Sequence, residues 1–397
     1  MRVSTASAYI NGISAIQRLQ EALDFAQRQI STGRRILAPS DDPIASARSL
    51  ELRESLSRLN QFDRNAGIAT NRLSQEEAGL SSVGNVLQRV RELTLQANNA
   101  TQSDETRALI AIEMREQLDH LVQLANQKDG TGRYLFSGNL GDVQPVTRMG
   151  STFAYNGDQG QRFIQVGEGR QVTDGDPGSA IFFQIRNGNG VFSTAAAAAN
   201  TGTGLLGTGS VVDPTQYDQD QYTLRFIGPG NYEVVDSLGG IVTTGSYQSG
   251  DTVAFRGIEF SLSGQPATGD EFVVSPSQYQ SVFATIDNIA TALERSITDD
   301  ASRAAMTNGA NAGLIDIDQA LGKVLDIRTQ VGSRLAVTES QVDSNGAYAL
   351  IAQETLAEIE DLDYAEAISR LSLQVSTLEA AQQSFIRTQS LSLFNYF

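Results

Sequence analysis

Pairs of carboxylates are the side chains in this sequence with the strongest claim to chemistry. The pairs are Asp41 with Asp42, Asp299 with Asp300, and Glu358 with Glu360. General acid–base catalysis requires two carboxyl groups that face one cleft and differ in pKa. All three pairs lie at predicted helix starts or on solvated helix faces, where capping and the helix dipole account for the first two. We therefore predict no catalytic residues, and the chain is not expected to be an enzyme.

Metal and nucleotide sites also lack the residues they need. Asp174-Gly175-Asp176 and Asp218-Gln219-Asp220 could donate oxygens to calcium, but neither has the ligand ladder and distal glutamate of a calcium loop. We interpret both as turns. His120 is the only histidine and the chain has no cysteine, which leaves too few ligands for zinc. No P-loop or dinucleotide fingerprint occurs, so the sequence predicts no metal, cofactor or nucleotide.

The charge of the chain limits its partners. With 29 basic and 46 acidic residues the formal net charge is 29 − 46 = −17. Phosphate backbones and anionic lipid heads would repel such a chain, so neither nucleic acid nor a membrane is an expected partner. The first residues lack the pattern of a cleaved signal peptide, and no stretch approaches the ~20 apolar residues of a membrane span.

Both ends of the chain carry apolar residues at heptad spacing, which indicates coiled-coil helices. Near the N-terminus the row is Tyr9, Ile16, Leu23 and Ile30. Near the C-terminus the rows are Tyr364, Leu371, Leu378 and Phe385, beside Ile368 and Val375. Glutamines flank these seams, so each helix alone has little apolar surface to offset the entropy of its ordering. We predict that these residues form an assembly interface with other chains.

Further helices are predicted inside these ends. Ser40-Asp41-Asp42-Pro43 supplies a cap at Ser40, acids for a first turn and a proline near the first helical position. Five leucines and Ala66 then recur every seven residues through residues 52–87, which predicts a long coiled-coil helix with an intramolecular core. Residues 98–103 are the predicted break before a helix that starts at Asp104. Heptads return through residues 283–342.

The middle of the chain has a different pattern. Short alternating runs such as Tyr222–Phe226 and Ile258–Leu262 predict strands that are exposed on one face. Glycine-containing turns separate them at the spacing of antiparallel hairpins. Small residues without periodicity from Ala195 to Gly209 predict a mobile loop.

These elements predict an α+β fold. Long coiled-coil-like helices from both chain ends pack together, and an antiparallel β-rich domain is inserted in the middle. Three domains are predicted: a terminal coiled-coil assembly domain (1–33 and 362–397), a helical bundle domain (34–145 and 276–361) and a β-rich outer domain (146–275).

Motifs in both helical arms resemble the flagellin family. Two of them are similar to the helix-to-helix junction and the second-helix signature of flagellin-like proteins: Ser31–Ile36 with Pro39–Pro43, and Leu87–Leu93. The others look more like the hook-filament junction branch of the family than like filament flagellins: Gly132–Gly138, Tyr155–Gly160, Asp361–Ala367, Gln382–Phe385 and Leu391–Phe397. The resemblance covers residues 1–170 and 275–397.

This resemblance implies a structural protein of the bacterial flagellum. It implies export through the flagellar secretion apparatus without a cleaved signal peptide, assisted by a cytoplasmic export chaperone, and an extracellular location. It also implies a ring of identical subunits between the first hook-associated protein and flagellin. The alternatives are a filament flagellin, or a secreted coiled-coil adhesin whose β-rich domain binds a ligand. A hydrolase in the β region lacks a nucleophile with its base and orienting group.

Overall fold

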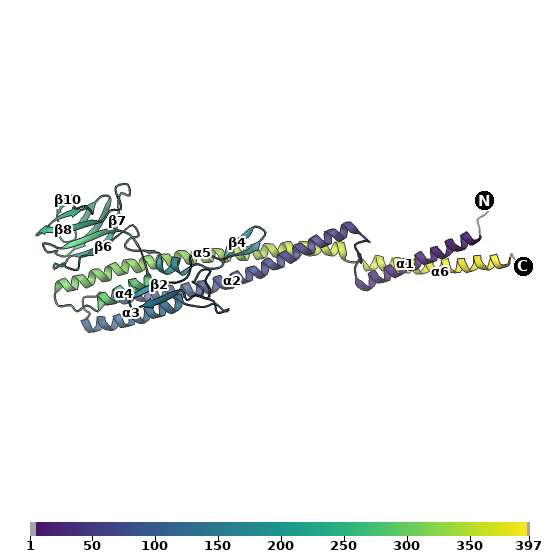
Figure 1. Cartoon of the computed structure of the whole chain (residues 1–397), viewed down its shortest axis with the longest axis horizontal. Helices are drawn as coiled ribbons and strands as arrows, with labels where there is room; N and C mark the ends of the chain where they lie inside the picture. Colours follow the sequence, from purple (N-terminus) through teal and green to yellow (C-terminus); the bar gives the residue numbers. More distant parts are fainter. Residues whose placement is uncertain (1–4, 395–397) are drawn as a thin grey trace. The chain divides into compact units, whose positions relative to one another are not determined.

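The computed structural model describes residues 5–394 of the 397-residue chain (Figure 1). The last three residues of the C-terminal motif Leu391–Phe397 lie outside this range. The described helices are α1 (Thr5–Thr32), α2 (Pro43–Ala97), α3 (Asp104–Ala125), α4 (Val282–Leu293), α5 (Asp300–Glu360) and α6 (Tyr364–Phe394).

All described strands lie between α3 and α4. The first five, with a π-helical turn η1 (Ser179–Phe183), are β1 (Val146–Met149), β2 (Thr152–Tyr155), β3 (Phe163–Gly167), β4 (Arg170–Thr173) and β5 (Ile185–Arg186). The others are β6 (Phe192–Ala196), β7 (Leu205–Val211), β8 (Tyr222–Gly228), β9 (Asn231–Val235), β10 (Ile241–Ser246), β11 (Thr252–Phe255), β12 (Ile258–Ser263), β13 (Glu271–Pro276) and β14 (Tyr279–Gln280).

The chain divides into two compact units, and each is described by itself. Unit 1 consists of Met1–Arg64 and Gln341–Phe397, and unit 2 consists of Asn65–Ser340. Helices from the two ends of the chain pack together, and antiparallel sheets are inserted between them in the sequence. This confirms the predicted α+β fold. The three predicted domain boundaries stay a prediction.

The start of α2 follows from its capping residues. The Asp42 carboxylate accepts the N–H of Ala45 at 3.0 Å, and Pro43 is the first helical residue. Asp41 turns the preceding chain, because its carboxylate accepts the N–H groups of Leu37 and Ala38. The predicted cap at Ser40 is therefore wrong by two residues, and the aspartate next to the proline takes this role.

The predicted break between α2 and α3 is confirmed. The chain turns after Ala97, and Ser103 caps α3 by accepting the N–H of Thr106 at 3.2 Å. Asp104 and Glu105 then place two acids in the first turn, where the helix dipole favours them.

The first core of unit 2 lies among α2, α3, α4 and α5. Leu73, Leu80 and Leu87 of α2 are at most 1% exposed. They belong to one apolar cluster with Leu118 of α3 and Ile317 of α5. From Ala66 to Leu87 the predicted row of α2 is thus an intramolecular core, whereas Leu52 and Leu59 are half-buried and lie outside this cluster.

The strands β1 to β5 and η1 share this first core. The Phe182 ring, carried by η1, lies 5.6 Å from Phe136 and 5.5 Å from Phe283 of α4 between ring centroids. Phe153 of β2 stacks on Phe283 with 5.3 Å between ring centroids. The segment up to Arg186 is therefore held by the helices and, at β5, by pairing with β14.

Strands β6 to β13 enclose a second core. A five-stranded sheet has the order β10-β9-β8-β13-β6 and a three-stranded sheet the order β11-β12-β7, with antiparallel pairing throughout both. Phe226, Phe260 and Phe272 are each 1% exposed within this core. Alternating exposed and buried residues along β8 and β12 confirm the predicted strands.

The predicted mobile loop from Ala195 to Gly209 is wrong. Its two ends belong to β6 and β7, and Ala195 pairs with Val273 of β13. The segment between them is held by the buried Asp270 carboxylate, which accepts the N–H groups of Thr201 and Gly202. Small residues are needed here for close packing, since a Cβ at Gly209 would lie 2.5 Å from the ring of Phe192.

The chain enters and leaves this β-sandwich at one place. Ser277 donates its N–H to the carbonyl of Val191 at 2.9 Å, and Asn187 donates to Gln278 at 3.0 Å. The β-sandwich of residues 192–276 can therefore be removed without stretching the flanking chain.

We expect that joining Val191 to Ser277 through two glycines leaves the first core of unit 2 folded, with cooperative thermal unfolding by circular dichroism. The matched control removes residues 171–276 and so also removes η1. This control should lose cooperative unfolding, because truncating a buried phenylalanine such as Phe182 alone costs about 3–5 kcal/mol. Equal behaviour of the two deletions would contradict the assignment of η1 to the helical core.

Candidate assembly site

The terminal helices α1 and α6 run antiparallel, side by side, in unit 1 (Figure 1). At the end near the chain termini, the ring centroids of Tyr9 and Phe385 are 5.4 Å apart. Gly12 lies against the same ring, since a Cβ there would approach Phe385 to 2.7 Å. The half-buried members of the predicted interface are Ile16, Leu23, Ile30, Leu371, Leu378 and Phe385. We call them, with Tyr9, the inner seam, and they are accounted for by pairing of α1 with α6 inside one chain.

The other predicted residues of α6 lie along the exposed edge of the same apolar stripe. Tyr364, Ile368 and Val375 are 51%, 52% and 37% exposed. At about 100° per residue they fall within about 40° of one another around the helix and border the inner seam directly, since Tyr364 is about 20° from Leu371. Ile386, which is 63% exposed, continues this edge and was missed by the sequence prediction. We call these four residues the outer stripe.

The junction between the paired helices fixes which faces meet. Gly33 ends α1 with a positive φ of 70°, a conformation that favours glycine. Its carbonyl accepts the N–H of Leu362, and the N–H of Arg35 donates to the carbonyl of Glu360 at 2.7 Å. This short ladder joins the end of α1 to the start of α6.

Two polar contacts at the junction were missed by sequence reasoning. Gln29 is 5% exposed, and its side-chain amide donates to the carbonyl of Arg35. Arg53 of α2 forms a bidentate pair with Glu360, and this hydrogen bonding holds the pKa of the Glu360 carboxyl below its usual range. Glu360 is thus an exception to the predicted solvated face. No local pattern separates Gln29 from the other glutamines, because its partner lies beyond the helix end.

In each of the other two carboxylate pairs, one member has a capping role of the kind that the sequence predicted. Asp42 caps α2, and Asp299 accepts the N–H of Ser302 at 2.8 Å at the start of α5. Hydrogen bonds from Ser302 also lower the pKa of the Asp299 carboxyl.

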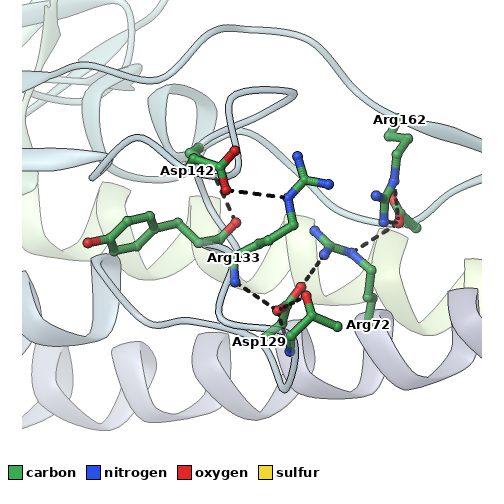
Figure 2. A network of polar contacts seen from close by, with 9 residues as sticks. Arg72, Asp129, Arg133, Asp142 and Arg162 are labelled. Carbon is green, nitrogen blue, oxygen red and sulfur yellow. Dashed lines mark hydrogen bonds and ion pairs between the residues drawn. The ribbon is translucent and has the colours of Figure 1, made fainter.

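The interpretation of Asp174 and Asp176 as turn residues is wrong. They are 2% and 6% exposed and are paired with arginines from several elements. Figure 2 shows Arg72 of α2 reaching Asp129, and Arg162 lies nearby, paired with Asp174. We define the buried charge cluster as Arg72, Glu76, Asp129, Arg162, Asp174, Asp176 and Arg334. Its partners are up to 158 residues apart in the sequence, so no local motif reveals it.

Residues 5–394 contain few other features that could carry chemistry. In that range no group of three histidine, cysteine or acidic side chains is placed to hold a metal, and His120 is exposed. A cavity of about 470 Å³ between β6, β7, α4 and α5 is lined mainly by small residues and amides, together with Arg295, Asp316 and a few aliphatic side chains, and no aromatic ring is among its lining residues. No described helix is long and apolar enough to cross a membrane.

Known proteins share the sequence pattern and the architecture of this chain. The family model described as the bacterial flagellin N-terminal helical region matches residues 3–140. Flagellar hook-associated protein 3 of Salmonella typhimurium is 26% identical over 395 residues, which cover 99% of each chain. The crystal structure of Xanthomonas campestris FlgL is 36% identical and has a TM-score of 0.73, over 77% of this chain and 99% of that one. The chain belongs to the FlgL family.

The flagellar junction protein FlgL from Legionella pneumophila is similar too, with 33% identity and a TM-score of 0.73, over 79% of this chain and all of that one. A flagellin of Salmonella moscow matches only 84% of this chain and 70% of its own length, at 24% identity. This FlgL family member is therefore a structural component of the bacterial flagellum at the hook-filament junction. It is not an enzyme, and the filament flagellin and adhesin alternatives are set aside.

We expect Gly33→Ala to destabilise the paired helices of this FlgL family member by about 1–2 kcal/mol, the cost of a left-handed conformation for a residue with a Cβ. That Cβ would also lie 2.9 Å from the Tyr364 hydroxyl. Gly346→Ala in α5 is the matched control, because no atom lies within 4 Å of its Cβ position. It should stabilise the helix by about 0.5–1 kcal/mol. Urea unfolding followed by helix circular dichroism measures both, and an unchanged Gly33→Ala midpoint would contradict the junction geometry.

Proposed function

We propose that copies of this chain form a ring between the first hook-associated protein and flagellin, and that the terminal helices supply the contacts. The observation that carries this proposal is the outer stripe of α6. Its apolar side chains lie along the exposed edge of an apolar stripe whose other edge already contacts α1.

The energetics favour an external partner for the outer stripe. A single partner covers only one face of a helix, and the apolar side chains elsewhere on that helix remain in water. Fully burying one such side chain contributes about 1.5–3 kcal/mol. Because each subunit of a ring repeats the contact, the three predicted residues and Ile386 would be buried at every interface.

The charges of the terminal helices also suit contacts between copies. The whole chain carries −17, so like-charged subunits repel one another. By contrast α1 carries two acids and two arginines, as does α6. Their net charge of zero allows these helices to pack against their own copies without that repulsion.

The chain must also reach the flagellum. We infer secretion by the flagellar export apparatus with the help of a cytoplasmic export chaperone, and final placement outside the cell. Membership of a family of flagellar junction proteins supports this inference.

We expect Ile368→Asp to prevent filament attachment while the isolated protein keeps its helix content, because the charge would have to be buried between subunits. Leu373→Asp is the matched control. Leu373 is 68% exposed on the same helix and lies about 140° from Ile368, so it belongs neither to the inner seam nor to the outer stripe. Cells would be scored for filaments after secretion of each variant is verified. Normal filaments with Ile368→Asp, or their loss with both variants, would contradict the proposal.

A further inference from the structure

Glu76 is a buried carboxyl group that the assembly role does not use. It lies in α2 and is 2% exposed, although glutamate is almost never fully buried without a partner. One carboxyl oxygen accepts the backbone N–H of Asp176 at 2.9 Å. The other, Oε2, is buried and has no hydrogen-bond partner. A charged carboxylate would leave this oxygen uncompensated.

The charged groups around Glu76 come from several elements. Arg72 is one turn earlier on α2, Asp176 lies on the segment between β4 and η1, and Arg334 projects from α5. Arg334 forms a bidentate pair with Asp176, with N–O distances of 2.8 and 3.1 Å. Arg72 pairs with Asp129 and Asp174 at 2.5 and 3.0 Å. Arg162 completes the buried charge cluster through Asp174.

The formal charges of the buried charge cluster sum to zero only when Glu76 is neutral. The three arginines of the cluster carry +3, and its three aspartates, Asp129, Asp174 and Asp176, carry −3. An ionised Glu76 would make the sum +3 − 4 = −1, with the added charge next to Asp176. A proton on Glu76 removes this excess charge.

We propose that Glu76 and the buried charge cluster act as a pH-sensitive clasp. When Glu76 is protonated, the clasp holds the segment 174–178 between α2 and α5. When Glu76 is ionised, repulsion from Asp176 loosens that segment. Because the same segment leads into η1, the clasp also secures the entry of Phe182 into the helical core.

The titration of Glu76 agrees with this geometry. Burial, and next the Asp176 carboxylate, raise the pKa of Glu76 to about 8, against the opposing effects of the Asp176 N–H, Arg334 and Arg72. The folded state therefore keeps a proton that the unfolded chain releases near its ordinary value of about 4.5. A raised carboxyl pKa gives stability that is fully present below the unfolded value. That stability is lost as the pH rises to about 8, and it changes no further above this.

Hydrogen exchange of the purified full-length chain tests the clasp directly. The amide of Asp176, which donates to Glu76, and its neighbours in 174–178 should show protection factors that fall between pH 6 and pH 9. In Glu76→Gln, whose neutral amide keeps an oxygen acceptor, protection of this segment should not change over that range. Equal protection of the wild-type segment at both pH values would overturn the proposal.

Stability gives a second measurement with a matched control. The folding equilibrium constant of the wild type relative to Glu76→Gln should fall by up to about tenfold per pH unit within the titration window. Glu77→Gln removes the neighbouring acid, which is half-buried and pairs with Arg328 outside the buried charge cluster, and should leave the wild-type slope in place. If the folding equilibrium constant of Glu76→Gln changed with pH as steeply as that of the wild type, the proposal would be wrong.

Infrared spectroscopy covers the case in which Glu76→Gln does not fold. The folded wild type at neutral pH should show a carbonyl stretch of a protonated carboxyl group that disappears reversibly above pH 8. Absence of this band at neutral pH would also overturn the proposal.

Discussion

A helix that has one partner can bury one face, and any apolar residues on its other faces remain in water until a further partner arrives. The two edges of the apolar stripe of α6 show this constraint. Leu371, Leu378 and Phe385 are half-buried in the inner seam, whereas Tyr364, Ile368 and Val375 stay exposed. The junction at Gly33 and Leu362 determines which face α1 covers, and so it determines which face is left for other subunits. The proposed assembly role depends on this division.

Unit 2 meets the opposite situation, because its long helices have several partners. Apolar layers around Leu80 and Phe283 exclude water, and polar groups caught between these layers must satisfy one another. The buried charge cluster does so with arginines from α2 and α5 and aspartates from the connecting segments. Glu76 is the member whose second oxygen finds no partner, which is why its proton matters.

Local periodicity predicted the features that depend on neighbours in the sequence. The leucine row of α2, the break before α3 and the alternation in β8 and β12 all follow from residues a few positions apart. The prediction of a mobile loop at Ala195–Gly209 was wrong because its small residues are explained only by contacts with Phe192 and Asp270, which no local pattern reveals.

The candidate site was predictable to a lesser depth. Heptad spacing selected the residues of α6 but could not separate the inner seam from the outer stripe, since both lie near positions that a coiled coil would use. Gln29 and Glu76 were missed for a related reason: each is buried by a segment outside its own helix. Such burial depends on tertiary contacts that no local window contains.

We propose that the outer stripe, and not the inner seam, contacts neighbouring subunits. A photo-crosslinking amino acid placed at residue 368, and at residue 373 as a control, tests it in assembled flagella. We predict adducts to a second flagellar subunit from position 368 that disappear in the free protein, with few or none from position 373. Adducts of equal yield from both positions, or none from position 368, would contradict the account.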